Sequence, residues 1–208
     1  MNTKQAYDLW SEQYDTNENK TRDLEAKALR KTLENIDFDD CLEIGCGTGK
    51  NTVWLLEKAK HLTAVDFSEE MIGIAKGKID SNKVAFLHAD ITKDWNFTNR
   101  KFDLISFSLV LEHIENLDHI FKEASRLLKP GGYVYLGELH AFKQYLGTKA
   151  RFETGEGLQI LDCYIHNISD FIDSAKQNGL EIKDLNEFFD DDNRTAVPRV
   201  LAILFKKN

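Results

Sequence analysis

The chain has 208 residues, 42% of them hydrophobic and 30% charged, with a formal net charge of −8. This length suits a single domain, residues 1–208, with a substantial core. No apolar run approaches the ~18 residues of a membrane span, and the first residues lack the apolar core of a signal peptide. DNA is an unexpected partner for an acidic chain without a basic tract, because nucleic-acid binding depends on Lys and Arg.

Cysteine usage indicates the redox environment. Cys41, Cys46 and Cys163 form no Cys-x-x-Cys pair, and any disulfide scheme leaves one of them unpaired. We therefore expect reduced thiols and a cytoplasmic protein, as a monomer or homodimer.

The predicted elements alternate along the chain. Helical spacing of apolar residues indicates helices over residues 4–16 and 22–34. Short apolar runs then predict strands over residues 41–44, 62–65, 84–88, 102–107, 133–139, 180–189 and 200–205. Further helices are expected over residues 51–58, from the N-cap Ser68 onward, over about 116–128 and over 169–178. Because parallel strands need crossover connections, we predict an α/β, doubly wound sheet with helices on both faces. The last two strands have no helix between them and should form an antiparallel hairpin at one edge.

A glycine-rich loop follows the first predicted strand. Gly45, Gly47 and Gly49 allow a tight turn and a close approach to a ligand. Lys50 stands where a dinucleotide fingerprint has its third glycine, which argues against NAD, and the spacing is not that of a Walker A loop. Ligands of doubly wound sheets bind beyond the carboxyl ends of the strands, so the loop predicts a nucleotide site there.

Carboxylates end the next two strands. Asp66 can accept hydrogen bonds from both hydroxyls of a ribose, although a helix-capping acid is the structural alternative. Asp90 can accept one from the exocyclic amine of adenine, with Ala89 and Ile91 as apolar neighbours, although a solvated loop acid is again possible. With Ser106 on the fourth strand, these residues indicate one ligand site along the sheet edge.

Five motifs occur in order over about residues 40–140. The run from Cys41 to Gly49 resembles the first motif of class I S-adenosylmethionine (SAM) dependent methyltransferases, and residues 64–71 resemble the second. Residues 86–90 resemble the third, and residues 102–106 with 111–114, then 128–132, resemble the last two. The chain is similar to the UbiE and type 11 branch of this family. The resemblance implies a Rossmann-like, seven-stranded sheet of order 3-2-1-4-5-7-6 with the last strand antiparallel.

The resemblance also implies a set of cofactor contacts. They are Tyr14, Arg22, Glu43, Gly45, Cys46, Gly47, Gly49, Asp66, Phe67, Met71, Ala89, Asp90, Ile91 and Ser106. The first strand and its loop are expected to hold the methionine part, and Arg22 to pair with the SAM carboxylate. Residues 1–36 resemble a helical lid, and residues 138–168 an insert that shapes the acceptor pocket. We expect no metal, because no convincing set of carboxylates surrounds that pocket.

Histidines are the candidate catalytic residues. Methyl transfer from a sulfonium requires alignment and sometimes removal of a proton, for which histidine is suited near neutral pH. His140 follows the fifth strand and His166 precedes the last helix, so we predict that they are catalytic. His113, after the fourth strand, is expected to have a structural role.

The predicted function is methyl transfer from SAM to the oxygen or nitrogen of a small molecule, with S-adenosylhomocysteine as product. DNA-methylating motifs are missing: no Asn/Asp-Pro-Pro-aromatic element follows the fourth strand, and no cysteine follows a proline. A protein or tRNA methyltransferase, a non-catalytic SAM- or nucleotide-binding protein and a dehydrogenase remain as alternatives.

Overall fold

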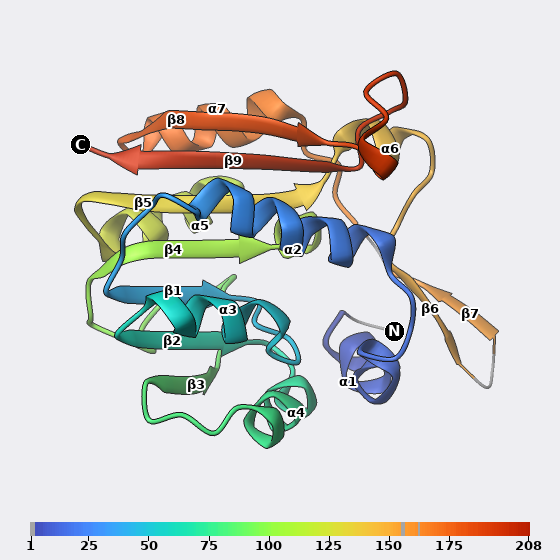
Figure 1. The fold of residues 1–208 in the computed structure, drawn as a ribbon, viewed down its shortest axis with the longest axis horizontal. Helices are drawn as coiled ribbons and strands as arrows, with labels where there is room; N and C mark the ends of the chain where they lie inside the picture. Colours follow the sequence, from blue (N-terminus) through green and yellow to red (C-terminus); the bar gives the residue numbers. More distant parts are fainter. Residues whose placement is uncertain (1–2, 155–156, 162) are drawn as a thin grey trace.

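The computed structural model describes residues 3–154, 157–161 and 163–208, and a seven-stranded sheet is the centre of the described part. Its strands are β1 (Asp40–Ile44), β2 (His61–Asp66), β3 (Val84–His88), β4 (Phe102–Ser108), β5 (Leu128–Leu139), β8 (Leu180–Phe188) and β9 (Val200–Lys207). The order is β3-β2-β1-β4-β5-β9-β8, and only β9 runs antiparallel to its neighbours β5 and β8 (Figure 1). Counted over the strands of this sheet, the order is the predicted 3-2-1-4-5-7-6, so the predicted fold is confirmed.

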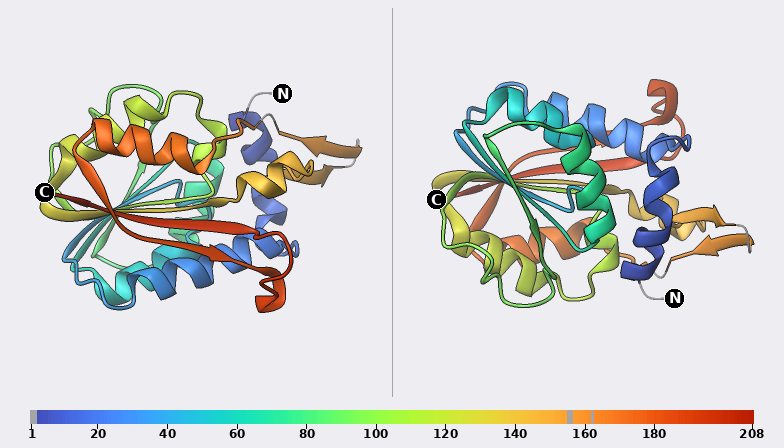
Figure 2. Two further views of the ribbon diagram at one scale, coloured as in Figure 1. Left: turned by 90° about the horizontal axis from the view of Figure 1, so that it is seen from above. Right: turned by 90° about the horizontal axis from the view of Figure 1, so that it is seen from below.

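Helices cover both faces of the sheet. They are α1 (Thr3–Tyr14), α2 (Lys20–Leu33), α3 (Lys50–Lys58), α4 (Glu69–Lys78), α5 (Leu117–Leu127), α6 (Ala141–Tyr145) and α7 (Ile168–Gln177), with short 3-10 turns η1 (Leu111–His113) and η2 (Asp190–Asp192). Figure 2 shows α2 and α3 on one face and α5 and α7 on the other. Side chains alternate between the faces, so Leu104 packs with the α2 cluster and Ile105 with the α5 and α7 cluster.

The connection between β3 and β4 contains no helix among residues 89–101. The fully buried Trp95 instead fills the space on the sheet face that α5 and α7 cover, and it packs in the same core as α5. Its ring nitrogen donates to the carbonyl of Ile91 at 3.0 Å, and its amide donates to the carboxylate of Glu123 at 3.0 Å. One large side chain with satisfied polar atoms thus closes the core without a helix.

A short helix and a hairpin between β5 and α7 are not predicted from the sequence. They are α6 and a hairpin of β6 (Arg151–Thr154) and β7 (Gly157–Ile160), which projects beyond the sheet beside α1 (Figure 1). Leu161, just after this hairpin, packs against Trp10 of α1. No helix of the described residues is long and apolar enough to cross a membrane.

Candidate active site

A cavity of about 280 Å³ lies at the carboxyl ends of the parallel strands. Its walls come from the glycine loop after β1, the ends of β2, β3 and β4 with the residues that follow them, and the overlying helix α1. This is the place at which a doubly wound sheet binds its ligand. Segments that are far apart in the sequence therefore meet around one cavity.

The glycine loop has two glycines, 45 and 49, that pack tightly against side chains, and one, 47, whose missing side chain leaves room in the cavity. A Cβ on Gly45, which has φ +73°, would stand 2.1 Å from a methyl carbon of Val110. One on Gly49, at φ +87°, would stand 2.7 Å from Ile79. Gly47 has φ +52° and lines the cavity, with no atom within 4 Å of an added Cβ. The loop thus keeps free the space that a ligand's polar chain would need.

Asp66 joins the loop to the end of β2. One carboxylate oxygen accepts the amide hydrogen of Gly47 at 2.7 Å, and the other accepts that of Ser68 at 2.8 Å. Burial raises the pKa of Asp66, although these two amides oppose that effect. Burial therefore disfavours the ionised form of Asp66. Hydroxyl groups of a ligand would stabilise that form by donating hydrogen bonds to it.

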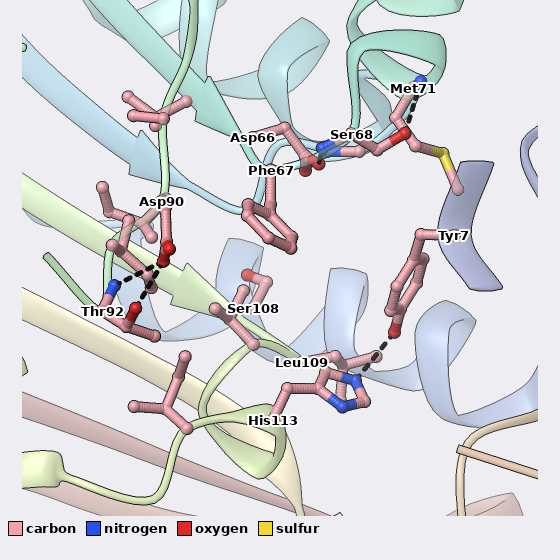
Figure 3. A pocket seen from close by; sticks show the side chains of 18 of the residues that line it. Tyr7, Asp66, Phe67, Ser68, Met71, Asp90, Thr92, Ser108, Leu109 and His113 are labelled. Carbon is pink, nitrogen blue, oxygen red and sulfur yellow. Dashed lines mark hydrogen bonds between the residues drawn. The ribbon is translucent and has the colours of Figure 1, made fainter. Parts of the chain in front are cut away.

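The adjoining wall has one apolar and one acidic part. The ring of Phe67 is 40% exposed and projects into the cavity (Figure 3). Asp90 accepts hydrogen bonds from the amide and hydroxyl of Thr92 through the same oxygen, at 2.9 and 2.6 Å. Ala89 and Ile91 complete this wall. A flat apolar group with an amine at its edge, such as adenine, fits this combination.

The opposite end of the cavity follows β4. Leu109 lines it with a positive φ of 57°, a conformation that is uncommon for a residue with a branched side chain and typical of functional sites. His113 in η1 lies close to Tyr7 of α1, and its Nε2 is 2.9 Å from the Tyr7 hydroxyl (Figure 3). Burial raises the pKa of Tyr7 well above its usual value, so this hydroxyl keeps its proton.

Helix α1 is fixed over the cavity by polar contacts at its middle and just after its last residue. The Ser68 hydroxyl, which also accepts the Met71 amide hydrogen as the N-cap of α4, donates to Asp8 at 2.6 Å. The Thr48 hydroxyl donates to Asp15, just after α1, at 2.7 Å, and Lys78 also pairs with Asp15. We call these Asp8 and Asp15 contacts the lid latches.

Several predicted cofactor residues do line the cavity, and others do not. Those on its wall are Tyr14, Gly45, Gly47, Asp66, Phe67, Met71, Ala89, Asp90 and Ile91. Arg22 lies outside, where its guanidinium donates to the carbonyls of Tyr14 and Asn17 and stacks over the Tyr14 ring. It fixes the turn after α1, and its predicted pairing with the SAM carboxylate stays a prediction.

Four residues of the first and fourth strand regions also lie away from the cavity wall. Glu43 is buried under the loop and accepts the Thr52 hydroxyl at 2.6 Å, while Cys46 packs with Ala64 and Ile72. Gly49 begins α3. Ser106 is 1% exposed inside β4, and Ser108 lines the cavity in its place. Residues two apart on a strand share a face, so Ser106 and Ser108 lie on the same face of β4, and the cofactor contact of Ser106 stays a prediction.

The two histidines predicted to be catalytic lie outside the cavity wall. His140 is fully buried, accepts the Phe142 amide hydrogen through Nδ1 at 3.2 Å and contacts Glu187 through Nε2 at 3.0 Å. His166 contacts the Ile114 carbonyl through Nε2 at 2.7 Å. Both have structural partners, and their catalytic role stays a prediction without support from the geometry.

The predicted lid and insert differ in part from what the structure places near the cavity. Within the described part of this lid, residues 3–36, α1 alone lies over the cavity, because α2 packs on the sheet through Ala28, Leu29 and Leu33. No described residue of 138–168 lines the cavity, and residues 155, 156 and 162 lie outside the described part. The insert instead supports the cavity from behind: the Tyr164 amide donates to the carbonyl of Glu112 in η1 at 2.7 Å.

Comparisons with known proteins agree with this geometry. The family model described as a methyltransferase domain matches residues 42–136, which include the glycine loop, Asp66 and Asp90. The ubiquinone biosynthesis O-methyltransferase of Pelagibacter ubique is 28% identical over 176 residues, covering 81% of this chain and 71% of that protein. An uncharacterized methyltransferase of Emericella nidulans is 27% identical over 225 residues, or 89% of this chain and 78% of that one.

The fold is also found among solved structures. The N-methyltransferase NodS of Bradyrhizobium japonicum, in complex with S-adenosyl-L-homocysteine, matches with a TM-score of 0.75 and 20% identity. That match covers 100% of this chain and 99% of NodS. Residues 42–136 therefore match a methyltransferase domain, and the chain has the fold of class I S-adenosylmethionine-dependent methyltransferases.

Proposed function

We propose that this chain transfers the methyl group of SAM to an oxygen or nitrogen atom of a small molecule and releases S-adenosylhomocysteine. The observation that carries the proposal is the Tyr7–His113 pair, which lies in the same cavity as Asp66 and Asp90 but beside the segment after β4. The same cavity thus has carboxylates that can recognise a ligand at one end and a pair that can accept a proton at the other.

The cofactor would lie along the cavity with its adenosine at the β2 and β3 ends. Asp66 would accept the ribose hydroxyls, and Phe67 with Ile91 would hold the adenine beside Asp90. The methionine part would then pass Gly47 and reach the segment after β4. When bound, SAM supplies an electrophilic methyl group, and the residues of the chain align the acceptor and exclude water.

The Tyr7–His113 pair is suited to remove a proton from the acceptor. Tyr7 remains protonated, and its hydroxyl can donate to Nε2 of His113 in the tautomer that has its proton on Nδ1. An acceptor hydroxyl or ammonium beside Tyr7 would pass its proton to the Tyr7 oxygen while the tyrosine proton moves to His113. The Glu112 carboxyl, 3.8 Å from the same ring nitrogen, would stabilise the imidazolium when it is ionised.

The size of the acceptor follows from the enclosure. Helix α1 covers the cavity and is held by the lid latches, so a folded protein or tRNA would have to displace it to reach Tyr7. The named methyltransferases among the relatives include one O-methyltransferase and one N-methyltransferase, which supports either atom as the acceptor.

Substitution of His113 tests the proposal. A screen of phenols, catechols, hydroxy acids and amines with radiolabelled SAM would first identify an acceptor. His113→Asn is expected to lower kcat on it by about 10²-fold, within the range for loss of a general base, while SAM affinity by calorimetry stays within about three-fold.

Parallel variants identify the base. His61→Asn, at the amino-terminal side of the sheet, is the control and should keep full turnover. Wild-type turnover in His113→Asn together with loss of turnover in His140→Asn or His166→Asn would identify a histidine of residues 138–168 as the base. Transfer only to protein or tRNA would overturn the small-molecule acceptor.

A further inference from the structure

A buried glutamate from outside the family motifs lies beneath the cavity floor. Glu25 of α2 is 2% exposed. Its Oε2 accepts a hydrogen from the side-chain amide of Asn51 at 2.9 Å, and its Oε1 accepts the Tyr135 hydroxyl at 3.1 Å. A Cβ on Gly137 would stand 2.5 Å from Oε1, so the glycine of β5 leaves the space that the carboxylate occupies.

Glu25 reaches the cavity through Ser108. Ser108 lines the cavity, and its hydroxyl lies close enough to the Glu25 carboxyl to lower the pKa of that group. A hydroxyl has a single proton, and an ionised carboxylate can only accept, so Ser108 can direct that proton to Glu25. The lone pairs of its oxygen are then left for the cavity, where they can face a positively charged ligand group.

The carboxyl has no basic partner of its own. No lysine or arginine among residues 3–154, 157–161 and 163–208 forms an ion pair with Glu25, and the nearby Lys50 pairs with Asp23. The amide oxygen of Asn51, which is 9% exposed overall, is buried without a hydrogen-bond partner. The floor therefore holds more acceptors than donors, an arrangement that a cation stabilises.

We infer that Glu25 is a positioning residue, which orients the Ser108 hydroxyl and supplies the negative charge that favours sulfonium-bearing SAM over its neutral-sulfur product. The inference rests on the proposed cofactor and its orientation, but not on the acceptor. If adenosine lies at Asp66 and Asp90, the sulfur lies toward Ser108. The product would then be released more easily than the substrate, because its sulfur has lost the charge that Glu25 faces.

The charge state of Glu25 makes this preference depend on pH. The titratable groups around it are Tyr14 of α1, Lys50 of α3, Glu43 of β1, and Tyr135 and Glu138 of β5. Burial raises the pKa of Glu25 to about 7 in the cofactor-free protein. A cation favours the ionised form, so SAM binding should release a proton near pH 7, and SAM affinity should rise as the pH rises through this region.

Substitution by glutamine separates charge from hydrogen bonding. Glu25→Gln keeps an oxygen that accepts from Ser108 but removes the charge. Calorimetry with SAM and with S-adenosylhomocysteine, from pH 6 to 9 in two buffers of different ionisation enthalpy, gives affinities and released protons. The SAM-to-product affinity ratio is expected to fall by about ten-fold at pH 8, and the pH-dependent rise in that ratio should disappear. Affinity for the product should change by less than about two-fold.

The ratio of the affinities for SAM and for S-adenosylhomocysteine removes effects that change the binding of both ligands equally. Both ligands contain the ribose and adenine, so any titration of Asp66 cancels in it. Glu123→Gln, a buried acid of α5 that pairs with Arg126, is the matched control and should leave the ratio unchanged. Ser108→Ala should lower the ratio in the same direction as Glu25→Gln. An unchanged ratio and unchanged proton release in a folded Glu25→Gln variant would overturn the inference, even if the enzyme still methylates its acceptor.

Discussion

At the scale of single residues, the site depends on the close approach of the Gly45 backbone to the Val110 side chain. Gly45 lies against Val110, and the two belong to different strand ends that must meet for the cavity to form. Any larger residue at 45 would separate the glycine loop from the segment that contains His113.

Alanine at Gly45 tests this close approach. Gly45→Ala should lower SAM affinity by at least about ten-fold and reduce stability, because the left-handed conformation costs ~1–2 kcal/mol and the Cβ also meets Val110. Gly131→Ala is the matched control, with φ +77° but nothing within 4 Å of an added Cβ. Denaturant titration and calorimetry should show a stability loss in both variants and a loss of binding only in the first. Equal SAM affinity in the two would contradict the packing argument.

Individual site residues were predictable where a strand pattern or the family motifs reveal them. Asp66 and Asp90 directly follow apolar strands, so their place at the sheet edge follows from the sequence. Tyr7 and His113 are 106 residues apart, and their contact depends on how α1 packs, which no local pattern contains. Tyr7 shares its helix with Tyr14, and that aromatic spacing was the one available signal.

At the scale of elements, α1 contributes no residue to the two cores of the sheet but covers the cavity through Tyr7 and Tyr14. Its apolar residues Ala6 and Trp10 form a small cluster with Leu161, separate from the two large cores of the sheet. Elements with few core contacts open most easily, so cofactor exchange should occur by movement of α1.

Removal of the lid latches should accelerate that exchange. The double variant Asp8→Ala, Asp15→Ala loses two charge-assisted hydrogen bonds, to Ser68 and Thr48, and SAM should dissociate about ten-fold faster or more. Stopped-flow tryptophan fluorescence can follow this step, because α1 contains Trp10. Asp173→Ala, an exposed acid of α7, should behave as the wild type. An unchanged dissociation rate in the double variant would show that α1 does not control release.

The elements themselves were largely predictable, because long periodic segments carry a strong local signal. All seven strands of the sheet appear near their predicted residues. The exceptions, α6 and the β6–β7 hairpin, have four or five residues per element, and the residues after the hairpin pack on α1 through Leu161 and bond η1 through Tyr164. Such short elements have no periodicity to read.

At the scale of the whole molecule, buried carboxyls set how stability depends on pH. Burial raises the pKa of Glu25 and Glu112 to about 7 and that of Glu43 and Glu138 to about 8. A glutamate in the unfolded chain has a pKa of about 4.3, so the folded state holds more protons between these values. The free energy of unfolding should therefore fall as the pH rises through this range.

Thermal unfolding of the cofactor-free protein checks this expectation. The Tm should drop by about 5 °C or more between pH 6.5 and 8.5, since several buried acids must ionise together. Saturating SAM should reduce the drop, because a bound cation stabilises the ionised acids. The lowered pKa of His140, caused by its burial, acts in the opposite direction but only near pH 6.5 and below. A Tm that rises over this range would mean that these carboxyls are already ionised in the folded protein.

The position of β9 has a consequence for the order in which the chain is synthesised. Residues 200–207 pair with β5 on one side and with β8 on the other, so they fill a gap between β5, which is made much earlier, and β8, the strand that precedes them. Until a ribosome has released them, β8 has no partner in the sheet and the edge of β5 stays open. The parallel half, with Asp66 and Asp90, can assemble beforehand. Nascent chains should thus have a formed cofactor edge and an incomplete sheet, in the state that most needs protection by a chaperone.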